Sequence, residues 1–254
     1  MRKIYIVLFV IFTGSILYSQ NSAQFTSKDY VSSLKKVTDL MVNDVASPVA
    51  AARYYAYVTL ASNEVTSLFQ VPANSFSKSL RHYQKLQVSD TLIAKSNASF
   101  ATIFTVFKMA EKLLPSGSKF AIDADSLTHL AIKKGIPIAQ VENTSKLVQI
   151  AVNQMMQYVK ADGFSKLSSY KKYTPLVGDG HWQPTAPGYM QALEPQWYRV
   201  RTFLLDSSQQ FKPKAPAAFD INKTSSFYKQ MFEVYTIVNQ LTKKEKAIAS
   251  FWDC

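Results

Sequence analysis

The stretch Gly180–Phe219, GHWQPTAPGYMQALEPQWYRVRTFLLDSSQQFKPKAPAAF, separates two groups of helix-forming segments. It holds five prolines and seven aromatic residues in forty positions. Proline fixes φ and has no N–H to donate, so this spacing excludes a long helix or a central strand. Long irregular segments in compact domains are usually functional or disordered, and this aromatic content argues against disorder. The sequence therefore predicts an ordered loop on a helical bundle, with Trp182 and Trp197 substantially buried.

Short motifs in this stretch carry a resemblance to a known family. They are WQPTAPGY from Trp182 to Tyr189, PQW ending at Trp197, and FKP and APA within Phe211–Ala217. Together with a later Phe-Trp pair, Phe251–Trp252, they resemble a region of bacterial vanadium-dependent haloperoxidases, which are related to type-2 phosphatidic acid phosphatases. Ala50–Ala56 is similar to the first core helix of that family. The motif positions are Trp182, Pro184, Thr185, Pro187, Gly188 and Trp197.

The resemblance implies an all-α fold and a bound vanadate at which hydrogen peroxide oxidises a halide, or a phosphatase reaction at the same anion site. It also implies where the anion is held. In this family the ligands are a Lys and an Arg a few residues apart, a Ser-Gly-His, and a later Arg followed by His. All of them lie downstream of the Phe-Trp pair.

Those anion-binding residues are absent from this sequence. Its arginines are Arg2, Arg53, Arg81, Arg199 and Arg201, and none stands in such a motif. The nearest matches to Ser-Gly-His are Asp179–His181 and Ser116–Ser118, and each lacks one residue. The sequence therefore predicts the N-terminal scaffold portion of a haloperoxidase-like protein, without catalytic, cofactor-binding or metal-binding residues of its own. Its implied partner is a separate or missing C-terminal helical half.

The first residues are typical of a targeting segment. Arg2-Lys3 precedes an apolar run, Ile4–Leu17, and small or polar residues follow. This pattern predicts a secretory signal peptide over residues 1–19, export to the periplasm or beyond, and a mature domain over 20–254. The run is shorter than the roughly twenty residues needed to span a bilayer, so no stable membrane span is predicted.

The net charge and its distribution limit which classes of binding partner are predicted. The net charge is +12, and removing two cations with the signal peptide leaves 12 − 2 = +10. The lysines are spread along the chain without a dense basic block, and an exported protein seldom meets nucleic acid, so nucleic-acid binding is not predicted. Two interpretations remain: a solvated basic surface, or a positive field that attracts an oxyanion.

Hydrophobic periodicity and capping residues predict an all-α bundle. Thr91–Leu114 is apolar almost all round and is expected to be buried. The predicted helical segments are Ser27–Val45, Ser47–Phe69, Ser77–Leu86, Thr91–Leu114, Ser126–Lys134, Pro137–Ala161, Ser225–Gln240 and a last helix from Thr242 to Trp252.

Few residues are candidates for catalysis, metal binding or substrate contact. His82, His129 and His181 lie far apart and lack a second metal ligand at helical spacing, so they are interpreted as surface or loop residues, with His181 the best placed to line a pocket. Arg53 lies on an apolar helical face, with Glu64 about three turns further on. Such an arginine needs a partner, and we expect a structural one from another helix rather than a substrate.

A second function remains open at this stage. The chain is also compatible with a non-catalytic exported binding module whose aromatic loop stacks on carbohydrate or contacts a protein. The scaffold hypothesis makes one further prediction. Ser47–Phe69 and Thr91–Leu114 would lose a neighbour without a C-terminal half, and would expose a contiguous apolar patch.

Overall fold

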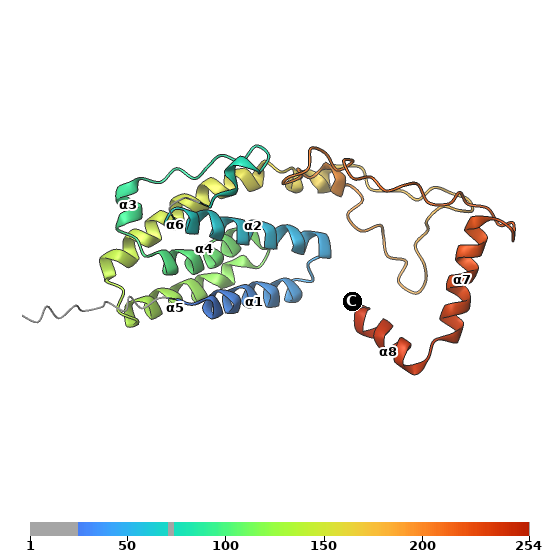
Figure 1. Ribbon diagram of the computed structural model, residues 1–254, viewed down its shortest axis with the longest axis horizontal. Coiled ribbons are helices and arrows are strands. Elements are labelled where there is room, and N and C mark those ends of the chain that lie inside the picture. The colour runs from blue at the N-terminus through green and yellow to red at the C-terminus, as the bar shows by residue number, and fades with distance from the viewer. Residues whose placement is uncertain (1–24, 71–73, 254) are drawn as a thin grey trace, which may run out of the picture. The chain divides into compact units, whose positions relative to one another are not determined.

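The computed structural model describes residues 25–70 and 74–253, and it is all-α within them (Figure 1). The predicted signal peptide, residues 1–19, lies outside the described residues. No helix among the described residues is long and apolar enough to cross a membrane. The α-helices are α1 Ser27–Asn43, α2 Pro48–Ser67, α3 Asp90–Ala94, α4 Ala98–Leu113, α5 Phe120–Lys133, α6 Ile138–Lys160, α7 Ser226–Gln240 and α8 Lys243–Trp252.

The chain divides into two compact units. The first runs to Ser168, contains α1 to α6, and also includes the short segment Arg199–Leu204. The second comprises Ser169–Tyr198 and Leu205–Cys254, with α7 and α8. The proline-rich stretch is therefore shared: most of it belongs to the second unit, and Arg199–Leu204 belongs to the bundle.

Local capping explains where several helices begin. Thr26 and Asp29 form a capping box at α1, and Thr242 and Glu245 form one at α8. At α2 the Ser47 side chain accepts from Ala50 N while Pro48 occupies the first turn, where its missing N–H costs nothing. The predicted starts of the helices near Ser47 and Thr242 are confirmed.

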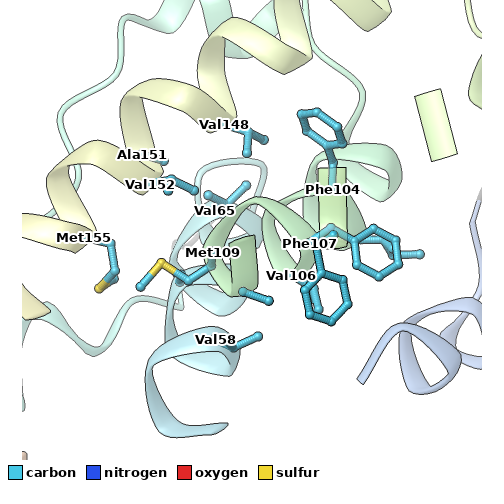
Figure 2. Packing of buried hydrophobic residues seen from close by; sticks show 14 of the residues in the cluster. Val58, Val65, Phe104, Val106, Phe107, Met109, Val148, Ala151, Val152 and Met155 are labelled. Atoms are coloured by element: carbon cyan, nitrogen blue, oxygen red, sulfur yellow. The ribbon is translucent and has the colours of Figure 1, made fainter. Parts of the chain in front are cut away.

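Helix α4 lies at the centre of the first unit and packs on α1, α2, α5 and α6. Figure 2 shows the layer that it forms with α2 and α6. Side chains from all three helices are buried there: Val58, Val65, Phe104, Val106, Phe107, Met109, Val148, Ala151, Val152 and Met155. Burial of one such side chain contributes about 1.5–3 kcal/mol, so this layer is the main source of stability of the bundle.

The exposed apolar patch predicted for α2 and α4 is wrong. Along α4 only Lys112 is exposed, and on α2 only Pro48 and Ala52 are exposed. The apolar circumference of α4 is explained by its four helical neighbours within the same unit, so it needs no further partner.

Three predicted boundaries are also wrong, the first two for a local reason. Thr91–Leu114 is split because the Asn97 side chain accepts from Phe100 N at 2.9 Å and begins α4 afresh after α3. Helix α5 begins at Phe120, earlier than the predicted Ser126, because a 3-10 turn feeds it and Phe120 is buried.

The third wrong boundary concerns Ser77–Leu86, where only the 3-10 turn Phe76–Lys78 forms. The buried carboxylate of Glu64 accepts from Ser75 Oγ and Phe76 N, each at 2.7 Å, and from Tyr83 Oη at 3.2 Å. Polar groups of this segment are thus satisfied by α2, and a positive φ at His82 excludes helix.

Candidate functional site

The motif residues of the proline-rich loop lie in the second unit and form no regular structure apart from a 3-10 turn at Trp197–Arg199. A turn closes the WQPTAPGY motif, because Tyr189 N donates to Thr185 O at 2.9 Å. The Ala186–Pro187 bond within that turn is cis. Pro184 is half-buried, and Thr185, Pro187 and Gly188 are exposed. The prediction that proline excludes helix and strand here is confirmed.

The predicted burial of the loop tryptophans is wrong for Trp182 and only partly met for Trp197. The Trp182 side chain is 49% exposed, and its ring lies 6.1 Å from that of Tyr173. Trp197 is half-buried. The Trp182 ring thus contacts a near neighbour in sequence rather than a large core.

None of the three histidines forms a metal site. His82, His129 and His181 are all exposed, and no cluster of three His, Cys, Asp or Glu side chains occurs in residues 25–70 and 74–253. The exposure of all three side chains agrees with their interpretation as surface or loop residues.

The buried polar centre of the bundle lies instead around Asp162. Arg53 Nε donates to Asp162 Oδ2 at 2.6 Å, with both side chains almost fully buried. Tyr57 Oη donates to the same oxygen at 3.1 Å, and Phe164 N donates to Oδ1 at 2.8 Å. Arg53 therefore has the structural partner that we expected, supplied by the residue after the C-cap of α6. Glu64 is not that partner.

A second arginine joins this centre from the proline-rich stretch. Arg201 Nη2 donates to Tyr57 Oη at 2.9 Å and to Tyr158 O at 3.0 Å, and its guanidinium lies 3.7 Å from the centre of the Tyr158 ring. The backbone N of Arg201 donates to Asp162 O at 2.9 Å. Two residues further on, Phe203 packs on Tyr57 with ring centroids 5.0 Å apart. These contacts anchor Arg199–Leu204 in the first unit.

Burial changes the pKa values of the tyrosine hydroxyls in and near this centre. Burial, and secondly the Asp162 carboxylate, raise the pKa of the Tyr57 hydroxyl well above its usual range. Burial and the Glu64 carboxylate do the same to the pKa of Tyr83. Both hydroxyls therefore stay protonated as hydrogen-bond donors to their carboxylates, and neither is suited to act as a base.

A cavity of about 760 Å³ lies beside Arg201 in the first unit, between residues 82–87 and the C-terminal part of α6. Its lining includes the basic side chains of His82, Lys85 and Arg201 and contains no carboxylate. Two other cavities, of about 590 and 430 Å³, have no charged lining residue.

The two helices of the second unit, α7 and α8, are amphipathic, and their apolar faces are exposed. No residue of α7 or α8 is buried. Large apolar side chains of both helices are at least half exposed: Met231, Phe232, Val234, Tyr235, Ile237, Val238, Ile248, Phe251 and Trp252. Soluble monomers rarely expose so many apolar side chains on neighbouring segments.

Comparison with known proteins supports a haloperoxidase-like fold for the all-α chain with its proline-rich loop. No family model and no curated protein matches the sequence. A solved structure described as the first bacterial vanadium-dependent iodoperoxidase is similar, with a TM-score of 0.82 and 28% sequence identity. The similarity covers 89% of this chain and 55% of that chain. The predicted resemblance to vanadium-dependent haloperoxidases is therefore confirmed for the fold, and this chain spans about half the length of that relative.

Proposed function

We propose that this chain is the N-terminal scaffold portion of an exported vanadium-dependent haloperoxidase or a related acid-phosphatase-like protein, inactive by itself. The observation that carries the proposal is the pair of amphipathic helices α7 and α8, of which no residue is buried. Helices of this kind are stable when they pack against further helices. The likeness to a bacterial iodoperoxidase, of whose chain only 55% is covered, supports the same interpretation.

The described residues do not fit vanadate. A highly charged oxyanion needs several donors that converge in a water-poor site. Arg53 is committed to Asp162, and Arg201 Nη2 is committed to Tyr57 and Tyr158. The cavity beside Arg201 adds one exposed lysine, Lys85, so it lacks the several converging cations that vanadate needs. We therefore assign no step of a vanadate reaction to this chain, and its role in the proposed enzyme is structural.

A different class of function is favoured by one observation. Trp182, Tyr189 and Tyr198 of the proline-rich loop are 49%, 65% and 54% exposed. Exposed aromatic rings on a loop suit stacking on sugar rings or contact with a protein. An exported binding module is therefore the second candidate.

An activity assay separates the two candidates. The purified chain is incubated with vanadate, hydrogen peroxide and iodide, and triiodide is followed by absorbance. The scaffold proposal expects no vanadate-dependent turnover from the chain alone. It expects turnover when the chain is co-produced with a segment that supplies the family's Lys–Arg, Ser-Gly-His and Arg–His residues. Turnover by the chain alone, abolished by substitution of one of its own residues, contradicts the proposal.

The binding-module candidate predicts ligand binding by the chain alone. Retention of the chain on immobilised polysaccharide, lost in Trp182→Ala and kept in a matched variant of a half-buried ring, Trp197→Phe, supports binding by the loop. Failure of co-production to restore turnover, together with such retention, favours the binding module over the scaffold.

A further inference from the structure

The cavity beside Arg201 combines a small-molecule volume with one-sided charge. At about 760 Å³ it lies in the size range of ligand pockets, which is roughly 300–1,000 Å³. Its basic lining residues come from two places in the sequence, His82 and Lys85 from the segment after α2 and Arg201 from the proline-rich stretch. None of its lining residues is acidic, so the wall itself supplies no counter-ion.

In the neighbouring buried centre, Arg201 forms no direct ion pair with a carboxylate of the described residues. Asp162 is paired with Arg53 at 2.6 Å. The hydrogen-bond acceptors of Arg201 Nη2, Tyr57 Oη and Tyr158 O, are uncharged. Arg201 Nε is buried, and no hydrogen-bond partner for it exists among the described residues. A buried donor without an acceptor is unfavourable, and an anion bound at this arginine would supply an acceptor.

Four glutamines complete the polar wall of the cavity: Gln84, Gln87, Gln154 and Gln157. Gln154 on α6 is fixed by two hydrogen bonds to the backbone of Gln87, from Gln87 N at 2.9 Å and to Gln87 O at 2.8 Å. This pair ties the segment carrying His82 and Lys85 to α6, so the wall is held in place before a ligand arrives. Primary amides both donate and accept hydrogen bonds, which suits hydroxyl groups.

We propose that this cavity binds a small hydroxylated organic anion of the sugar-phosphate or sugar-acid class. Arg201 and Lys85 attract its charged group, and the amides of Gln84 and Gln157 select its hydroxyls, because the Gln154 amide is already bonded to the Gln87 backbone. The proposal concerns a site within the first unit and is independent of the scaffold role, because it requires neither vanadate nor a further helical half.

Isothermal titration of the full chain tests this site with four probes: glucose 6-phosphate, glucuronate, glucose and inorganic phosphate. We expect one of the two sugar anions, or both, to bind saturably and at least about tenfold more tightly than glucose or phosphate, because only they use both the cations and the amides. The tighter of the two sugar anions identifies the preferred anionic group. Raising the salt concentration weakens this binding, because the attraction is partly electrostatic.

Two lysine variants form the matched test. Lys85→Gln removes an exposed cation from the cavity lining, and Lys95→Gln removes an exposed cation outside it. We expect Lys85→Gln to weaken binding about fivefold, as suits one partly exposed charge contact, and Lys95→Gln to leave it unchanged. Arg201→Gln should abolish binding, with circular dichroism as a check on folding. If Arg201→Gln does not fold, the comparison of Lys85→Gln with Lys95→Gln tests the site.

Three results overturn the proposal. One is the absence of saturable heat with both sugar anions. Another is phosphate or glucose binding as tightly as the sugar anions, which would mean that the combined recognition does not exist. The third is an equal loss in Lys85→Gln and Lys95→Gln, which would reduce the effect to net charge.

Discussion

Arg53 Nε lies 2.6 Å from Asp162 Oδ2, although the two residues are 109 positions apart in the sequence. The pair joins α2 to the end of α6, and Tyr57 and Arg201 extend it to the proline-rich stretch. Because both charges are buried, each depends on the other. Removing one leaves an uncompensated charge in the interior.

The first prediction concerns this ion pair. Arg53→Met should lower the free energy of unfolding by about 3–5 kcal/mol, measured by urea denaturation followed by circular dichroism. The control is Lys35→Met, which breaks an exposed 2.8 Å pair with Asp39 and should cost less than about 1 kcal/mol. The double variant Arg53→Met with Asp162→Leu should cost less than the two single changes added together. Equal losses in Arg53→Met and Lys35→Met contradict a buried pair.

The second prediction concerns the turn between α4 and α5. A Cβ added at Gly117 would lie 2.5 Å from Ala110 O and 2.5 Å from Glu111 O, which are backbone atoms. Gly117→Ala should therefore lower the free energy of unfolding by about 1–3 kcal/mol. The control is Gly188→Ala, where the nearest atom is Met190 Cγ at 3.4 Å. Thermal melts of both variants check the difference, and an unchanged melting temperature for Gly117→Ala rules out the close contact.

Alkaline pH gives the third prediction. The pKa values of Tyr57 and Tyr83 are raised above the ordinary value of 10.0 in the folded chain. Below pH 10 both states keep these protons and the stability is complete. Above pH 10 the unfolded chain releases them while the folded chain retains them, so stability is lost as the pH rises. The slope contributed by each tyrosine reaches about 1.4 kcal/mol per pH unit.

Urea denaturation of the wild type, Tyr57→Phe and Tyr189→Phe between pH 9 and 11 measures that slope. Tyr57→Phe should show a shallower decline than the wild type. Tyr189→Phe, which removes an exposed ring, should follow the wild type. Parallel curves for all three proteins would be incompatible with a raised pKa at Tyr57.

The sequence was most informative where structure depends on nearby residues. The capping residues Ser47 and Thr242 set the starts of their helices, and the apolar circumference of α4 predicted its burial. Predictions failed where distant residues decide. Glu64 of α2 accepts the hydrogen bonds of Ser75 Oγ and Phe76 N, and no helix forms over Ser77–Leu86. The division of Thr91–Leu114 has a local cause that the sequence prediction overlooked, because Asn97 caps a new helix.

The site was less predictable than the fold. The need of Arg53 for a partner was clear from its apolar helical face, but the identity of Asp162 was not, because pairing across 109 residues leaves no local pattern. Arg201 was missed altogether. Its signal is the Arg-Val-Arg between Tyr198 and Phe203, where a charge stands among aromatic residues. The motif tryptophans pointed correctly to the class of fold but not to a buried site.

The central claim is that α1 to α6 form a closed bundle whereas α7 and α8 require further helices. Hydrogen–deuterium exchange of the purified chain, read by mass spectrometry, measures this directly. We expect strong protection of the buried helix α4 and exchange of α7 and α8 close to the rate of an unfolded peptide, because no residue of either is buried. Protection of α7 and α8 equal to that of α4, in a chain shown to be monomeric, would contradict the scaffold account.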